Sequence, residues 1–300
     1  MAHIIETREL TVYYGKHRGI KDVNLAVEQG EVFGFLGPNG AGKTTTQRVL
    51  LDVIHPTAGN ATIFGMDCQE QGVEIRKRVG YLPGELNLYP NMKANAFLDM
   101  LASLQDGASD KKFRDDLCQR LTLDPTRRMK EYSRGNKQKV GIVAAFMGKP
   151  DLLILDEPTG GLDPLVQQTV MELVREVKAD GRTVFFSSHI LPEVQAVCDR
   201  VGIIRDGELV QTSTVDALTE QQFKRVHLAF QQMPPVDAFA IEGVTEVERD
   251  DNMIKFEVQD NLPRLMEIAA PFGIEDMDVP HVTLEEIFLN FYDTNANGGK

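Results

Sequence analysis

The chain has 300 residues, of which 42% are hydrophobic, and a formal net charge of −13. This length predicts one large and one small domain, and the composition is sufficient for a buried core. No apolar stretch approaches the roughly 20 residues that a membrane-spanning helix needs, and the first residues lack the features of a signal peptide, so we expect a cytoplasmic protein without direct membrane insertion.

The acidic residues are concentrated near the C-terminus, because residues 211–300 contain 17 acidic side chains against 6 Lys or Arg. A nucleic-acid groove needs clustered basic side chains, so nucleic acid is not an expected partner, and solubility is a sufficient explanation for the charge. Cys68, Cys118 and Cys198 lie far apart without metal-ligand spacing. That spacing predicts buried, reduced thiols.

The N-terminal part of the chain is rich in β-prone segments. Residues 4–14 and 23–27 show strand patterns, and residues 32–36 form an apolar run. Residues 61–64 and 79–82 add two short candidates. These segments predict a β lobe at the start of the chain.

A glycine-rich loop follows the apolar run directly and precedes a helical pattern over residues 45–54. It reads Gly37-Pro38-Asn39-Gly40-Ala41-Gly42-Lys43-Thr44-Thr45. Its glycines permit positive φ and close approach, so backbone N–H groups and the helix N-terminus can bind phosphates. Lys43 adds a positive charge, and the Thr44 hydroxyl is placed to bind Mg²⁺. The strand–loop–helix context favours a nucleotide site over a glycine-rich turn without a ligand.

Helical periodicity dominates the middle of the chain. Residues 93–105 and 110–121 show helical patterns that are separated near Gly107, and residues 135–147 show another. The patterns predict a helical insert over about residues 86–135.

Two apolar runs with polar ends follow the insert. Residues 152–155 end at Asp156-Glu157, and residues 183–186 end at Ser187-Ser188-His189. Asp163 and Pro164 are an N-cap and first-turn pair for a helix to about Ala179. Because strands and helices alternate, and the Asp206-Gly207 turn closes the pattern as a hairpin, we expect a doubly wound α/β core.

The polar residues at these strand ends are candidates for catalysis. Asp156 would hold Mg²⁺, Glu157 would orient or deprotonate the water that attacks the γ-phosphorus, and His189 would contact the γ-phosphate. Alone, an Asp-Glu pair is often only a capped strand end, and a histidine is often structural. The fixed order of the motifs favours the functional interpretation.

Beyond residue 215 the pattern becomes shorter and predicts a small accessory α+β domain over residues 216–293. Strands are expected near residues 226–230, 244–247 and 253–258, and helices near 262–270 and 284–292. Thr283 and Glu286 form a capping-box pair for the last helix, whose apolar stripe packs either on its own domain or on a partner chain. Residues 294–300 are expected to be a disordered tail.

Residues 4–212 resemble the ATP-binding subunit of an ABC transporter, and Tyr132-Ser133-Arg134-Gly135-Asn136 matches the signature of that family. The resemblance implies a P-loop NTPase core with an N-terminal antiparallel β lobe and a helical insert, over residues 1–215. It also implies that Ser133 and Gly135 contact the γ-phosphate of ATP held by the opposite subunit, and that Asp163 communicates across the interface. The working unit would then be a head-to-tail dimer around ATP and Mg²⁺.

Tyr14 is similar to the family's aromatic residue that stacks on adenine, with Tyr13 as the second candidate. A tyrosine that only completes a strand is the alternative.

The sequence departs from the family pattern in the signature and after residues 79–83. Arg134 and Asn136 replace the common glycine and glutamine. Gly84-Glu85 stands where the family usually has a glutamine that contacts Mg²⁺ and the attacking water, and Glu85 is the candidate replacement. We expect these departures to affect rate and coupling more than ATP binding, because the phosphate loop contributes its contacts independently.

Residues 86–92 and the insert resemble the region that receives a helix from a polytopic transmembrane permease. Leu88, Tyr89, Phe97 and Met100 are candidates for that socket, although core packing explains each of them equally well. Residues 280–288 resemble the tail of exporter subunits, which favours export and a peripheral location on the inner face of the cell membrane. The alternatives are a soluble ABC ATPase that acts on ribosomes or nucleic acid, and a nucleotide-dependent regulator with low turnover.

Overall fold

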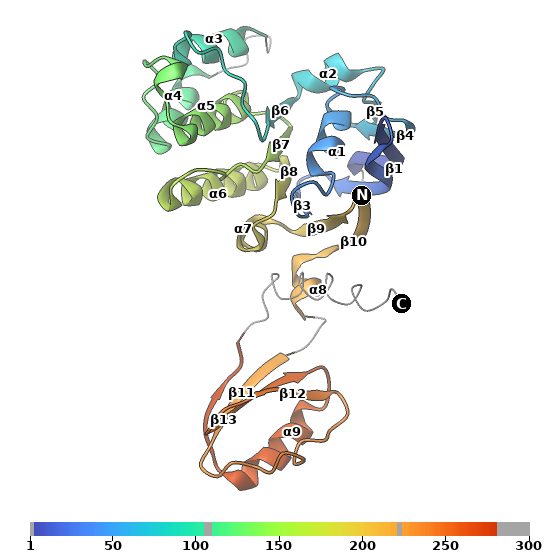
Figure 1. Cartoon of the computed structure of the whole chain (residues 1–300). Helices are drawn as coiled ribbons and strands as arrows, with labels where there is room; N and C mark the ends of the chain where they lie inside the picture. The colour runs from blue at the N-terminus through green and yellow to red at the C-terminus, as the bar shows by residue number, and fades with distance from the viewer. Residues whose placement is uncertain (1–2, 105–109, 221–223, 281–300) are drawn as a thin grey trace. The chain divides into compact units, whose positions relative to one another are not determined.

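The computed structural model of the chain describes residues 3–104, 110–220 and 224–280 (Figure 1). The chain divides into two compact units, Met1–Thr214 and Val215–Lys300. None of the described helices is long and apolar enough to cross a membrane. The three cysteines are buried and free, as the spacing predicts.

The first unit begins with an antiparallel sheet in the order β2-β1-β4-β5. The strands are β1 (His3–Tyr14), β2 (His17–Glu28), β4 (Ala58–Ile63) and β5 (Met66–Asp67). β2 starts earlier than the expected residue 23, because a tight turn pairs Tyr14 with His17 directly. Apolar residues of β1 and β2 point into the core, as the alternating pattern indicates.

The central sheet carries the carboxyl-terminal strand ends on which the candidate site depends. Its order is β10-β9-β3-β8-β7-β6, with β10 antiparallel to β9 and the other neighbours parallel. The strands are β3 (Val32–Leu36), β6 (Val79–Leu82), β7 (Leu152–Asp156), β8 (Thr183–Ser188), β9 (Arg200–Arg205) and β10 (Glu208–Thr214). Every residue of β3, β7 and β8 is buried, which explains their continuous apolar runs.

Helices cover this sheet and differ from expectation mainly at their ends. They are α1 (Lys43–Leu50), α2 (Gly72–Lys77), α5 (Arg134–Phe146), α6 (Pro164–Ala179) and α7 (Leu191–Val197). α1 starts before the expected residue 45 and ends before the expected residue 54. Its early end is explained by Asp52, whose φ of 57° a right-handed helix does not allow. The Asp163 side chain accepts a bond from the Val166 N–H at 3.1 Å, which confirms the predicted N-cap of α6. α2 and α7 were not predicted, because 6 and 7 residues are too few for a clear periodic pattern.

The insert between β6 and α5 contains α3 (Ala94–Leu104) and α4 (Lys111–Arg120). Both predicted helices are therefore confirmed. Figure 1 shows α3, α4 and α5 grouped at one side of the unit, with the β1 and β4 strands at the other.

The second unit has an antiparallel sheet in the order β12-β13-β11-β14. Its elements are α8 (Val215–Glu220), β11 (Lys224–Phe230), β12 (Val244–Arg249), β13 (Met253–Val258), α9 (Leu262–Ala269) and β14 (Ile274–Asp278). Leu265 and Ala269 of α9 pack in one core with Leu228 and Phe256 of the sheet. β14 was not predicted, and the expected helix at 284–292 and tail at 294–300 lie outside the described residues.

Candidate nucleotide site

The glycine-rich loop connects β3 to α1, and its tight packing explains two of its glycines. A Cβ on Gly37 would lie 2.4 Å from the Ile204 carbonyl oxygen. A Cβ on Gly42, whose φ is 112°, would lie 2.5 Å from Ile20 Cγ2. Larger residues at either position would move the loop away from its neighbouring strands. The backbone from Gly37 to Gly42 can therefore approach a phosphate closely.

Lys43 lies within this loop and is only 5% exposed. Its Nζ donates hydrogen bonds to the Gly37 carbonyl at 2.7 Å and the Pro38 carbonyl at 3.1 Å, and it lies 3.6 Å from Glu157 Oε1. Burial lowers the pKa of the ammonium, while the nearby Glu157 and Asp156 carboxylates oppose that shift. The loop thus surrounds one positive charge, the arrangement that a polyphosphate requires.

Asp156 lies at the end of β7 and is hydrogen-bonded through both carboxylate oxygens. The Thr44 hydroxyl donates to Oδ2 at 2.8 Å, and the Ser187 hydroxyl donates to Oδ1 at 2.6 Å. The strand register explains the second bond, because Asp156 is paired with Ser187 between β7 and β8.

The Thr44 hydroxyl and the Asp156 carboxylate fit Mg²⁺, which is commonly bound by few protein oxygens together with substrate phosphates. Among the described residues no group of three or more His, Cys, Asp or Glu side chains is arranged to hold a metal alone. Because Mg²⁺ takes about six oxygen ligands, a cation held by Thr44 and Asp156 would take further ligands from a nucleotide or from water.

Glu157 brings its carboxylate between Lys43 and His189. Its Oε1 lies 2.9 Å from His189 Nδ1, and its backbone has a φ of 49°. This left-handed conformation is unusual for glutamate, and neighbouring groups hold it in place. The Glu157 N–H donates to the Ser187 carbonyl at 3.0 Å, and the Glu157 carbonyl accepts from the Gln138 side chain at 3.3 Å.

Tyr14 lies beside the loop, whereas in the described part of the chain no hydrogen bond joins Tyr13 to it. The Tyr14 hydroxyl is 3.5 Å from Thr45 Oγ1, and its Cε2 is 2.9 Å from the position of a Cβ on Gly19. The Tyr14 side chain is 45% exposed. Its position suits the predicted aromatic contact with a base, which stays a prediction.

Ser133 and Gly135 begin α5. The Ser133 hydroxyl accepts from the Asn136 N–H at 3.3 Å, and a Cβ on Gly135 would lie 2.7 Å from the Gly161 carbonyl. In the described part of the chain, no hydrogen bond joins Ser133 or Gly135 to the glycine-rich loop. The chain thus brings Lys43, Thr44, Asp156, Glu157 and His189 together, and among the described residues no hydrogen bond joins Ser133 or Gly135 to this group.

Sequence reasoning missed Ser187, Gln138 and Glu193, which hold this group of residues. Gln138 and Ser187 bond to Glu157 and Asp156 as described, and Glu193 of α7 bonds to Thr159 and Ser188. Ser187 lies at the strand end beside Ser188-His189, so its position in the sequence could have indicated it. Gln138 and Glu193 lie within α5 and α7, away from the strand ends, and give no comparable signal.

Comparison with known proteins identifies the family of the chain. Residues 20–160 match the family described as ABC transporter. The chain is 34% identical over 310 residues to the bacitracin transport ATP-binding protein BcrA of Bacillus licheniformis, a match that covers 100% of this chain and 99% of that protein. The chain belongs to the ABC transporter ATP-binding proteins.

Two further similarities agree with this family. The chain is 38% identical over 222 residues to the uncharacterized ABC transporter ATP-binding protein sll0415 of Synechocystis sp., covering 70% of this chain and 62% of that protein. A solved structure of an ATP-binding subunit of an ABC transporter has a TM-score of 0.67 and 29% identity, covering 73% of this chain and 92% of that one. The predicted P-loop NTPase fold is confirmed, and the chain is an ATP-binding, ATP-hydrolysing subunit of the ABC type.

In this ABC subunit Gly84 lies close to the Asp156 carboxylate. A Cβ on Gly84 would lie 3.0 Å from Asp156 Oδ2, so a larger side chain there would crowd the carboxylate. Glu85 is exposed and does not join Asp156 and Glu157 in a metal-binding group of carboxylates among the described residues. The metal role of Glu85 stays a prediction.

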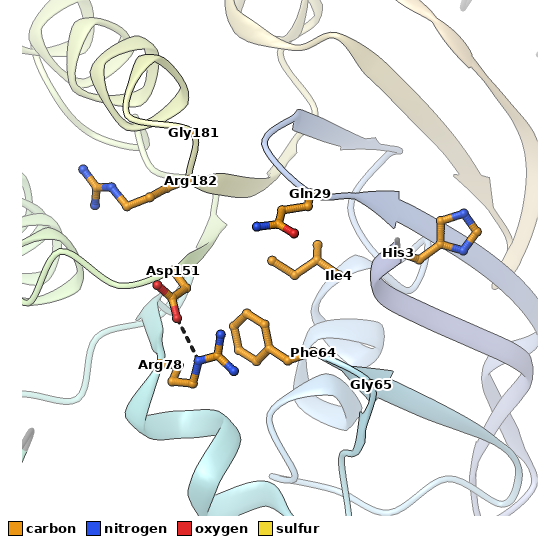
Figure 2. A pocket seen from close by; sticks show the side chains of 9 residues that line it. All are labelled: His3, Ile4, Gln29, Phe64, Gly65, Arg78, Asp151, Gly181 and Arg182. Carbon is orange, nitrogen blue, oxygen red and sulfur yellow. Dashed lines mark hydrogen bonds and ion pairs between the residues drawn. The ribbon is translucent and has the colours of Figure 1, made fainter. Parts of the chain in front are cut away.

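A cavity of about 440 Å³ lies at the opposite end of the central sheet (Figure 2). It is lined by His3, Ile4, Gln29, Phe64, Gly65, Arg78, Asp151, Gly181 and Arg182. Asp151 and Arg182 precede β7 and β8, whereas Asp156 and Ser188 end these strands. Arg78 pairs with Asp151 at 2.7 Å and lies 3.8 Å from the centre of the Phe64 ring, so its charge is satisfied inside the cavity. The cavity is separate from the nucleotide site.

Proposed function

We propose that this subunit drives a separate polytopic membrane permease in an export system, with the residues around Lys43 and Asp156 as its ATPase site. The observation that carries this proposal is the convergence of Lys43, Thr44, Asp156, Glu157 and His189 from three segments of the chain. The chain is similar over its full length to a bacitracin transport protein, which supports a role in transport. Residues 280–288 resemble the tail of exporter subunits, which supports export.

Each residue has a role that follows from its position. Lys43 and the loop N–H groups bind the β- and γ-phosphates, and the Thr44 and Asp156 oxygens hold Mg²⁺ with the nucleotide. When bound, Mg²⁺ neutralises charge on the phosphates. Glu157 orients or deprotonates the attacking water, and His189 contacts the γ-phosphate. Tyr14 stacks on adenine.

The signature residues act on a second copy of the chain. Ser133 and Gly135 are not hydrogen-bonded to the loop of their own chain in the described residues, and the exposed Ser133 begins a helix whose N-terminus favours anions. We infer that they contact the γ-phosphate of ATP held by the partner in a head-to-tail dimer. Asp163, whose helix follows the loop after Glu157, contributes to the same interface.

A hollow of about 440 Å³ on the insert side supports a docking site for the permease. It is lined by Leu86, Asn87, Leu88, Tyr89, Pro90, Met129, Lys130 and Lys137. Tyr89 is 58% exposed, and its ring lies 6.4 Å from that of Phe97, so Phe97 supports the tyrosine. Met100 is not among the residues that line the hollow. A helix of the permease would place apolar side chains here.

The subunit would then lie peripherally on the inner face of the cell membrane, with residues 1–215 as its ATP-binding domain and 216–293 as an accessory domain.

Co-purification tests the class of partner. We expect the tagged chain to retain a polytopic membrane protein encoded beside its gene, and Tyr89→Ala to weaken that association. Leu165→Ala is the matched control, because Leu165 is 75% exposed on α6, outside the hollow. Recovery of ribosomes or nucleic acid instead of a membrane protein would favour the soluble alternative.

A further inference from the structure

The Glu193 carboxylate of α7 connects the loops that carry the two candidate catalytic side chains. Its Oε1 accepts a hydrogen bond from the Thr159 hydroxyl at 2.5 Å, and its Oε2 accepts one from the Ser188 hydroxyl at 3.0 Å. Thr159 and Ser188 are 2% and 1% exposed. Each carboxylate oxygen therefore holds a different buried hydroxyl group.

These hydroxyl groups lie close to Glu157 and His189 along the chain. Thr159 follows Glu157 by two positions in a turn where the Gly160 N–H donates to the Glu157 carbonyl at 3.1 Å. Ser188 precedes His189, and its Oγ also accepts from the Ile190 N–H at 2.9 Å. Glu193 thus fixes the backbone on both sides of the contact between Glu157 and His189.

In the observed bridge both carboxylate oxygens accept, each from a different hydroxyl group. Glutamine has one acceptor oxygen and one NH2 donor, so the bond to one of the two hydroxyl groups would have to reverse its direction. A simpler explanation is that Glu193 only stabilises the first turn of α7, where acidic residues interact favourably with the helix dipole. That explanation would not require the hydroxyl of Thr159.

We propose that Glu193 is a positioning residue for ATP hydrolysis, which holds the turn after Glu157 and the segment around His189 in a fixed relation. The inference rests on the proposed roles of Glu157 and His189. A displacement of α7 would move both segments together, so the helix links the position of the water-activating carboxylate to that of the γ-phosphate contact.

The experiment uses the full chain with the substitutions Glu193→Gln and Thr159→Val, and Thr159→Ser to restore the hydroxyl. Gln195→Ala, at an exposed position of the same helix, is the matched control. Because small displacements of catalytic groups lower rates strongly, we expect kcat to fall about tenfold to a hundredfold in Glu193→Gln and Thr159→Val. The affinity for ATP should stay unchanged, and Thr159→Ser should retain most of the kcat.

Thr159→Val keeps the shape of the side chain, so it tests the bridge even if Glu193→Gln does not fold. Unchanged kcat in folded Thr159→Val would overturn the inference, as would a Thr159→Ser variant that is as slow as Thr159→Val. Glu157→Gln and His189→Ala are measured in parallel. If these two substitutions leave kcat unchanged, the proposed site itself is wrong; if they lower kcat and Thr159→Val does not, only the role of Glu193 is wrong.

Discussion

Glu157 Oε1 lies 2.9 Å from His189 Nδ1, although 32 positions separate the two residues in the chain. Parallel pairing of β7 with β8 brings the two strand ends to one edge of the sheet. The same carboxylate lies 3.6 Å from Lys43 Nζ, so a phosphate bound by Lys43 would be close to both groups. This relationship makes Glu157 the first residue to test.

Glu157→Gln should keep ATP binding and slow hydrolysis by about 100- to 10,000-fold, because it removes a group that acts in the transition state. Single-turnover hydrolysis and nucleotide titration measure the two effects separately. Glu172→Gln, at an exposed position of α6, is the control. Normal turnover of the Glu157 variant would exclude the proposed catalytic role.

Lys43→Ala should weaken ATP binding about tenfold or more, because a hydrogen bond to a charged group contributes about 1.5–3 kcal/mol. Calorimetric titration with ATP gives the affinity. Lys77→Ala, on the short helix α2 where Lys77 pairs with Glu74, should bind normally. An unaltered affinity in Lys43→Ala would mean that the loop does not bind phosphates in this way.

The lowered pKa of Lys43 predicts a pH dependence of ATP binding. Phosphates favour the ammonium form, so the pKa of Lys43 is higher in the bound than in the free protein. Binding then takes up protons, so the affinity for ATP should fall as the pH rises above the pKa of Lys43 in the free protein. Because that pKa lies below 10.5, the fall should begin below pH 10.5. Titrations over this range should show the decline in the natural chain. A Lys43→Ala chain with the same decline would contradict the assignment.

Asp156→Asn should weaken the binding of Mg²⁺-ATP more than the binding of ATP in the presence of a chelator. The substitution removes the negative charge next to Thr44 and leaves one oxygen for the Ser187 hydroxyl or the metal. Titrations with and without Mg²⁺ provide the comparison. Equal losses in both conditions would argue against a metal role.

Phe185→Ala should destabilise the first unit by about 3–5 kcal/mol, because it removes a large side chain from a closely packed core. Phe185 is fully buried, and its ring lies 5.9 Å from that of Phe33 and 5.3 Å from that of Phe35. Denaturant unfolding measures the change. Leu165→Ala, at an exposed position, should have little effect, and an equal loss in both variants would mean that the aromatic contacts are not responsible.

Several elements of the site were predictable from local sequence. The strand–loop–helix pattern around Lys43, the acidic end of β7 and the N-cap Asp163 all depend on residues within a few positions of one another. Periodicity and capping act over such short distances, so these features can be predicted from the local sequence. The short helices α2 and α7 contain too few residues for such a signal.

The contacts between these segments depended on the tertiary structure. Thr44 and Asp156 are 112 positions apart, and only the order of the parallel strands brings them to 2.8 Å. Tertiary packing also determines three further features of the site. They are the left-handed backbone of Glu157, the short distance between position 84 and Asp156, and the hydrogen bonds of Glu193. The sequence by itself determined which chemical groups are present and on which strand ends and loops they lie, because those features are local. Only the folded sheet decided which groups meet, because strand order and register join residues that no short-range pattern connects.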